Sequence, residues 1–210
     1  MKHVPRAIYY LLGGLIGFVA LTPVASAQPA VTTETMVHQL AGLEAAVDID
    51  VAALRQQALD RIKSRADAEP LKRPPIAAEL LGLPQIAVEV QFDPDSAIIR
   101  PPSYQTLGRI ADAVSDPALL PYSFLIVGHT GPTGKRENNL TLSQRRADSI
   151  RDALVTTFKI SPKRLRAVGL GEEQLLDAAH PAAAINQQIQ IVTVGQLDDR
   201  QAPPVAINRK

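Results

Sequence analysis

Hydrophobic residues recur along this chain with two different spacings, and their order predicts an α/β fold. Alternating or continuous apolar residues, which are typical of strands, occupy four segments: 86–92, 122–127, 165–168 and 189–194. Helical spacing, with apolar residues three and four apart, occupies two longer segments at 104–114 and 139–158. The order strand–helix–strand–helix–strand–strand predicts an α/β sandwich in which a mixed sheet carries its helices on one side.

Three details of this pattern predict how elements begin or where they lie. Ser103 precedes the first long helix and is a residue type that caps helix N-termini. Residues 122–127 are almost wholly apolar, which predicts a central strand covered on both faces. Ser161-Pro162 predicts a short helical turn, because proline is tolerated at the first helical position.

Two shorter helices are predicted before this unit, at 33–43 and at 50–62, the second capped by Asp50. Short isolated helices are not stable in water, so these two either pack on the domain, pair with a partner, or fray. Prolines between them and the first strand predict a linker. The predicted organisation is a helical segment at 28–63, a linker at 64–83, the domain at 84–196 and a flexible tail at 197–210.

The first residues have the pattern of a secretory signal peptide. Lys2 and Arg6 form a basic start, residues 7–21 are mainly apolar, and Ala25-Ser26-Ala27 fits a cleavage site. We therefore expect a signal peptide at 1–27 and a periplasmic protein of a Gram-negative bacterium, with outer-membrane association left open. The alternative is an uncleaved anchor, although the apolar run is shorter than the roughly 20 residues that span a membrane.

Composition excludes several classes of site. The chain has no cysteine, so disulfides, thiolate metal sites and a lipid-anchoring cysteine are excluded. Without residues 1–27 it carries 20 basic and 21 acidic residues, a balance that does not suggest nucleic acid as a partner. The histidines at 38, 129 and 180 lack paired ligands at metal spacing, so we expect no metal site and no cofactor.

An arginine on the second long helix is the clearest candidate binding residue. At 100° per residue, Arg146 falls on the apolar stripe between Leu142 and Ile150, whereas Arg145 points toward solvent. A guanidinium stays charged, and burying it unpaired costs several kcal/mol, so Arg146 needs an anion or a route to water. Spacing alone leaves open whether that anion is a ligand or an internal carboxylate such as Asp93, Asp95 or Glu172.

Two motifs resemble the C-terminal peptidoglycan-binding domain of the OmpA-like family. Phe124-Leu-Ile-Val-Gly-His-Thr-Gly131 and Asn139-Leu-Thr-Leu-Ser-Gln-Arg-Arg146-Ala147 stand where the family has roughly Gly-His-Thr-Asp, a Gly, and Asn-x-x-Leu-Ser-x-x-Arg-Ala. Phe92-Asp93-x-x-Ser96-Ala97 and Gly169-Leu-Gly171-Glu172 match two further family motifs. The resemblance covers roughly residues 86–194 and implies a βαβαββ OmpA-like domain that is preceded here by a short helical segment.

The resemblance also implies a ligand and the residues that hold it. Such domains hold the diaminopimelate of the peptidoglycan stem peptide with the aspartate after Gly-His-Thr and the arginine that matches Arg146. Here Gly131 replaces that aspartate, and Gln187 and Gln188 replace the arginine pair of the family's final motif. Losing one charge-assisted hydrogen bond costs ~1.5–3 kcal/mol, on the order of 10- to 200-fold in affinity.

Catalytic and nucleotide-binding alternatives fit poorly. Residues 128–135 look like a phosphate loop, but five residues separate the outer glycines and Arg136 stands where Ser or Thr would bind magnesium. His129 has no accompanying nucleophile motif, so its predicted role is to shape the loop through hydrogen bonds. We therefore expect no enzyme activity.

The predicted function is non-catalytic binding of periplasmic peptidoglycan. Arg146 takes the carboxylate of diaminopimelate, and Asn139 and Thr130 offer hydrogen bonds beside Gly131. Asp93 is a candidate substitute acid, and Asp95 or Glu137 could also replace the missing one. The alternative is an OmpA-like scaffold that has lost wall binding and contacts another envelope protein, through the helices before Pro70. An apolar stripe left exposed on residues 50–62 would favour this alternative.

Overall fold

The computed structural model describes residues 31–47, 49–64 and 73–197. The predicted signal peptide, and the predicted tail beyond residue 197, lie outside the described residues. The predicted element order is confirmed within this range, with the short Ser161-Pro162 turn as a 3-10 helix at Pro162–Arg164. The helices are α1 (Thr33–Leu40), α2 (Val51–Lys63), α3 (Tyr104–Val114) and α4 (Arg136–Thr156), and the strands are β1 (Gln85–Val88), β2 (Tyr122–His129), β3 (Leu165–Gly171) and β4 (Ile189–Gln196).

The four strands form one mixed sheet in the order β1-β4-β2-β3. β2 pairs in parallel with β3 and antiparallel with β4, which in turn pairs antiparallel with β1. The parallel pair requires a crossover connection, and α4 supplies it. β2 is a central strand, and its residues 124–129 are all buried, as the apolar run at 122–127 predicted.

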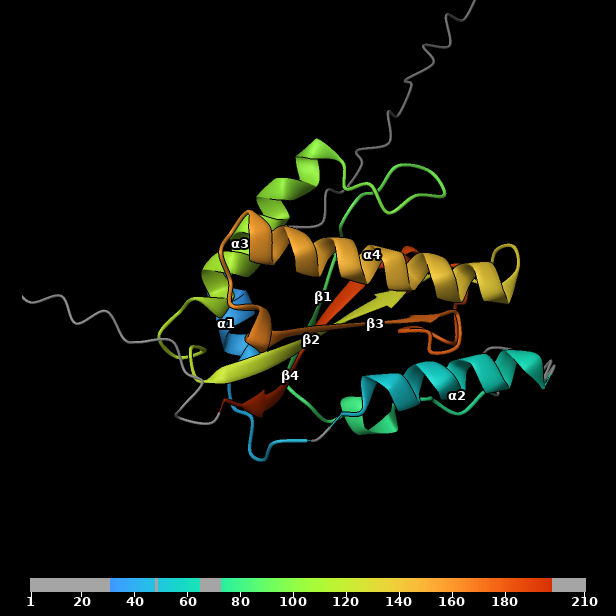
Figure 1. The fold of residues 1–210 in the computed structure, drawn as a ribbon, viewed down its shortest axis with the longest axis horizontal. Coiled ribbons are helices and arrows are strands. Elements are labelled where there is room, and N and C mark those ends of the chain that lie inside the picture. The colour runs from blue at the N-terminus through green and yellow to red at the C-terminus, as the bar shows by residue number, and fades with distance from the viewer. Residues whose placement is uncertain (1–30, 48, 65–72, 198–210) are drawn as a thin grey trace, which may run out of the picture. The chain divides into compact units, whose positions relative to one another are not determined.

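The helices of the domain cover one face of the sheet, as predicted, and an N-terminal helix covers the other (Figure 1). On the first face, α3 and α4, together with α1, pack over strand residues such as Phe124 and Ile126. On the second face, α2 packs over Leu125 and Val127. The mixed α/β sandwich is therefore confirmed, and the short helical segment before the domain completes its core.

The N-terminal helices pack on the domain, which decides among the three possibilities that the sequence left open. Asp50 caps α2 as predicted, accepting a hydrogen bond from the amide of Ala53 at 3.0 Å. The apolar stripe of α2 is buried against the sheet: Leu54, Ala58 and Ile62.

Residues 73–83 fall within the predicted linker, yet Ile76, Ala77 and Leu80 are 8%, 0% and 0% exposed on the same face. This part of the predicted linker therefore belongs to the core.

Some predicted boundaries are wrong. α4 begins at Arg136, three residues before the predicted start at Asn139. β1 ends at Val88, and Phe92 forms only an isolated bridge with Ile99. Ser103 does not cap α3 with its side chain; its hydroxyl instead accepts a hydrogen bond from the amide of Gln91 at 2.7 Å.

Glycines let α4 lie unusually close to the sheet. A Cβ atom placed on Gly128 of β2 would be 2.3 Å from the backbone oxygen of Ser143, and one on Gly169 of β3 would be 2.1 Å from the amide nitrogen of Gln144. Two backbone amides of the edge strand β3 donate hydrogen bonds to side chains of α4. Gln144 accepts from the amide of Gly169 at 2.8 Å, and Ser143 accepts from the amide of Gly171 at 2.9 Å. Ser143 therefore helps pack α4 against the sheet.

Candidate functional site

Arg146 lies at the edge of the buried face of α4, beside the loop that follows β1. The buried residues of that face include Ser143, Ala147 and Ile150, whereas Leu142 and Arg146 are only partly buried. Arg145, one residue earlier, is exposed as predicted. The stripe prediction for Arg146 was thus slightly misplaced, and the side chain keeps one side toward solvent.

The guanidinium of Arg146 has few protein partners. Its Nε donates to the backbone oxygen of Ser96 at 3.0 Å, and its Cζ lies 4.8 Å from the ring centroid of Phe92, in a cation–π contact. Among the described residues its two terminal nitrogens make no hydrogen bond and no ion pair within 4.0 Å. Burial lowers the pKa of Arg146, and the charge of Asp95 opposes that shift. The side chain is thus held at one end while its fork remains available to an anion.

Asn139 organises the loop between β2 and α4. Its Nδ2 donates to the oxygens of Gly131 (3.3 Å) and Thr133 (2.9 Å) and to the carboxylate of Glu172 (2.7 Å). An amide has only two such hydrogens, so all its donor capacity is used inside the protein. The local role of Asn139 in shaping the loop is therefore present in the structure, and direct contact between Asn139 and a ligand stays a prediction.

Thr130 and Gly131 follow β2, and Gly131 is the position where the family's aspartate is missing. The hydroxyl of Thr130 is buried and has no hydrogen-bond partner among the described residues, although its amide donates to Gly171. A Cβ on Gly131 would meet Gln187 Nε2 at 3.6 Å, an ordinary contact. Two of the three positions that lack the family's charges, 131 and 187, therefore face each other as a neutral pair.

The three acidic residues that could pair with Arg146 have different partners in the structure. Asp93 lies 3.7 Å from the Nε of Arg100, and both side chains are about half exposed. Glu172 is occupied by Asn139 and Arg73. Asp95 is the carboxylate whose charge acts on Arg146. Its φ is +50°, a left-handed conformation that Asp tolerates better than most residues and that is frequent at functional sites.

Arg146 and Asn139 mark the two ends of the candidate site. They are seven residues apart on α4, so they lie on nearly the same face at about 10 Å along the helix axis. Arg146 contacts the loop at 92–96 and Asn139 the loop at 131–133. No hydrogen bond or ion pair within the described part of the chain joins these two groups directly.

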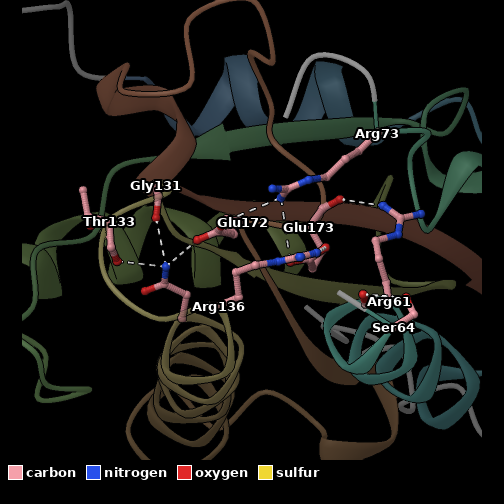
Figure 2. A network of polar contacts seen from close by, with 9 residues as sticks. Arg61, Ser64, Arg73, Gly131, Thr133, Arg136, Glu172 and Glu173 are labelled. Carbon is pink, nitrogen blue, oxygen red and sulfur yellow. Dashed lines mark hydrogen bonds and ion pairs between the residues drawn. The ribbon is translucent and has the colours of Figure 1, made fainter. Parts of the chain in front are cut away.

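A network of buried charges supports the Asn139 end of the site, and the sequence prediction missed most of it. Figure 2 shows the turn after β3, where arginines from three segments approach Glu172 and Glu173. Arg136 holds Glu173 through two hydrogen bonds of 2.7 Å, and Arg73 lies 3.5 Å from Glu172 and 3.8 Å from Glu173. Arg61 of α2 donates to the backbone oxygen of Glu173 at 3.2 Å. The side chain of Glu173 is only 1% exposed, so its pairing matters.

His129 is buried at the end of β2 and shapes the loop through hydrogen bonds, as predicted. Its Nδ1 lies 2.8 Å from the backbone oxygen of Gln174 and its Nε2 3.1 Å from Gln190 Oε1, which belongs to a side chain bonded in turn to Gln85. Burial lowers the pKa of His129 below its usual 6.5, and both hydrogen bonds partly oppose this.

This buried histidine predicts that acid weakens the fold. Because the folded-state pKa of His129 is depressed, the unfolded chain binds more protons below about pH 6.5, and stability falls as the pH falls through that value. We expect a lower urea midpoint at about pH 5 than at pH 7.5, and a smaller difference in the His129→Asn variant. An equal difference in both proteins would contradict this assignment.

Neither a metal centre nor a membrane span is found in the part of the chain that the structure describes. No three His, Cys, Asp or Glu residues gather there as metal ligands. His180 instead bonds Asp177 at 2.9 Å on the surface. None of the described helices is both long enough and apolar enough to cross a bilayer.

Comparison with known proteins identifies the domain that carries this site. Residues 91–188 match the OmpA family model. Outer membrane porin F of Pseudomonas fluorescens is 32% identical over 109 residues, covering 50% of this chain and 32% of the porin. The peptidoglycan-associated lipoprotein of Brucella melitensis is 35% identical over 103 residues, covering 49% of this chain and 60% of the lipoprotein. The matched part thus spans about a third of the porin and three fifths of the lipoprotein.

One solved structure that is similar to this chain is also a peptidoglycan-associated lipoprotein. The crystal structure of the peptidoglycan-associated lipoprotein from Burkholderia pseudomallei is 28% identical, with a TM-score of 0.41, and covers 60% of this chain and 98% of that one. The family match includes both loops of the candidate site and the whole of α4. Residues 91–188 of this chain are therefore OmpA-like, as the sequence motifs indicated.

Proposed function

We propose that this protein is a non-catalytic binder of peptidoglycan that acts in the periplasm and grips the diaminopimelate stem peptide mainly through Arg146. The observation that supports this proposal best is the environment of the Arg146 guanidinium. It is half-buried and fixed through Nε to Ser96, while its terminal nitrogens have no protein acceptor among the described residues. A carboxylate placed there would accept two parallel hydrogen bonds. The names of two relatives, a peptidoglycan-associated lipoprotein and an outer membrane porin, agree with this setting.

The remaining contacts are proposed from the neighbouring loops. The Thr130 hydroxyl, buried and without a partner in the described part of the chain, would hydrogen-bond the ligand beside Gly131. Asp95 is a better candidate for the substitute acid than Asp93, because Asp93 pairs with Arg100 whereas Asp95 acts on Arg146. An acid beside Arg146 would receive the ammonium group of diaminopimelate.

Replacement of Arg146 tests this proposal. We expect the Arg146→Ala variant to bind purified peptidoglycan sacculi at least about tenfold more weakly than the wild type, because it lacks the charge-assisted hydrogen bonds to the carboxylate. Co-sedimentation over a range of sacculus concentrations measures the affinity. The matched control is Arg145→Ala, which removes an equal charge from the exposed neighbouring position on α4.

Two results would contradict this role of Arg146. One is equal binding by wild type and Arg146→Ala, and the other is an equal loss in both arginine variants, which would indicate a general charge effect. Circular dichroism and thermal unfolding verify that the variants are folded. Cation–π contact with Phe92 is lost in Arg146→Ala, so a small decrease in stability is expected and does not bear on binding.

The neutral pair at positions 131 and 187 favours a second candidate, a scaffold that has lost wall binding and contacts another envelope protein. The Gly131→Asp variant separates the two candidates. A Cβ fits at position 131, and its φ is not in the left-handed region, so this variant should fold. Absence of sacculus binding in the wild type, with binding gained by Gly131→Asp, would favour the scaffold. The apolar stripe of α2 does not favour it, because that stripe is buried in the core.

A further inference from the structure

Three consecutive residues after β3 form a turn that contacts two different parts of the molecule. Glu172, Glu173 and Gln174, here called the bridging turn, are 5%, 2% and 6% exposed. Two carboxylates and an amide at this depth need partners, because a buried polar group without one is costly. The bridging turn finds those partners on opposite sides.

One side of the bridging turn holds the candidate binding loop. Glu172 accepts from Asn139 at 2.7 Å, and Asn139 in turn holds the backbone oxygens of the loop at 131–133. Glu173 pairs with Arg136 in the first turn of α4. The oxygen of Gln174 accepts from His129, which directly precedes Thr130.

The other side of the bridging turn is held by the segment before the domain. This segment, here called the N-terminal cover, comprises residues 51–64 and 73–83. Arg73 lies 3.5 Å from Glu172, Arg61 donates to the oxygen of Glu173 at 3.2 Å, and the amide of Ala77 donates to Gln174 Oε1 at 2.7 Å. Each residue of the bridging turn therefore has at least one contact with the N-terminal cover and one with the site or the residues beside it, and Figure 2 shows this arrangement for the two glutamates.

We propose that the N-terminal cover is a working part of the wall-binding site, and that Arg73 is a positioning residue that fixes the binding loop through Glu172 and Asn139. This inference rests on the proposed function. The family match begins only at residue 91, so Arg73 lies outside the matched region. The segment that precedes the domain would thus set how firmly the domain grips the wall.

The physical reason is the shared use of one carboxylate. Glu172 is buried and faces both the cation Arg73 and the amide of Asn139. Without Arg73, its charge loses a nearby cation and must draw water or shift toward solvent. The side-chain amide of Asn139 has two N–H hydrogens and three nearby acceptors. If Glu172 moves, the hydrogen bonds from Asn139 to the oxygens of Gly131 and Thr133 change as well. The loop would then lose part of its preorganisation for the ligand.

The test compares Arg73→Gln with Arg55→Gln in the intact chain. Arg55 is exposed on α2, so its replacement removes the same charge without touching the bridging turn. We expect Arg73→Gln to shift the NMR signals of the Asn139 side-chain amide and the backbone amides of Gly131 and Thr133 without ligand. We also expect about tenfold weaker binding to sacculi. Arg73→Lys, which keeps the charge, should recover part of that affinity.

The two readouts separate this inference from the function on which it rests. A folded Arg73→Gln protein with unshifted Asn139 signals and wild-type affinity would overturn the coupling. If the wild type itself does not bind sacculi, the proposed function fails, and the ligand-free NMR comparison still decides whether Arg73 positions the loop. If Arg73→Gln does not fold, Arg73→Met, which also removes the charge, serves for the same comparison, and unchanged Asn139 signals and affinity in it would overturn the proposal.

Discussion

Gly169→Ala should be among the most damaging single substitutions in this chain, although it adds only one methyl group. The new Cβ would be 2.1 Å from the amide nitrogen and 2.5 Å from the Cα of Gln144, both backbone atoms of α4. Rotation of a side chain cannot relieve such a clash, so α4 must move away from β3. Overpacking typically costs 1–3 kcal/mol, and because backbone must move here we expect at least about 3 kcal/mol less free energy of unfolding. Urea denaturation measures the difference.

Gly108→Ala is the matched control for this experiment. Gly108 lies within α3, and a Cβ there would be 3.6 Å from Phe158, an ordinary contact. Alanine has a higher helix propensity than glycine, by up to about 1 kcal/mol, so this variant should be as stable as the wild type or more stable. A Gly169→Ala protein as stable as Gly108→Ala would show that α4 does not lie as close to β3 as described.

Glu173→Gln should also destabilise the protein strongly, because it removes a buried charge and not because it adds volume as Gly169→Ala does. Glutamine keeps the shape of the side chain but removes the charge that pairs with Arg136 and lies 3.8 Å from Arg73. Because Glu173 is buried, its loss leaves guanidinium groups in the interior with less compensation. Breaking a buried pair by removing one partner costs about 3–5 kcal/mol, and we expect a loss near the lower end of this range, about 3 kcal/mol, because Gln can still accept hydrogen bonds.

The control for Glu173→Gln is Glu137→Gln. Glu137 is exposed in the first turn of α4, where an acidic residue interacts with the helix dipole for only ~0.3–1 kcal/mol. Urea midpoints of both variants at pH 7.5 give the comparison. Similar small losses in the two variants would mean that the buried ion pair contributes no more than an exposed charge.

The sequence predicted the order of elements and the type of fold because hydrophobic spacing reports directly on burial. It could not predict where α4 begins. Helical spacing of apolar residues was recognised from residue 139 onward, so the helix was expected to start there, whereas the structure starts it at Arg136. An ion pair with Glu173, 37 residues later, holds the Arg136 cation at this helix N-terminus, where cations are normally unfavourable. Contacts between distant residues override local signals in this way.

The candidate site was predictable where a motif names the residue and unpredictable where the contact is tertiary. Arg146 could be selected from its place on the helix, and its partial burial agrees with that selection. The involvement of Arg73 could not be found, because proline-rich surroundings predicted a linker and nothing local indicates that this arginine reaches Glu172. The pairing of Asp93 with Arg100 could not be predicted either, because the spacing of residues in the sequence does not show which acid lies next to which base.

The most direct test of the central claim compares two soluble stem peptides that differ in one carboxylate. Diaminopimelate carries a carboxylate at the end of its side chain where lysine has none, and this is the group that Arg146 is proposed to grip. Isothermal titration of the wild-type protein should give at least about tenfold tighter binding of the diaminopimelate peptide than of the lysine peptide. Arg146→Ala should abolish that preference. Equal affinities for the two peptides, or no binding of either, would contradict the account.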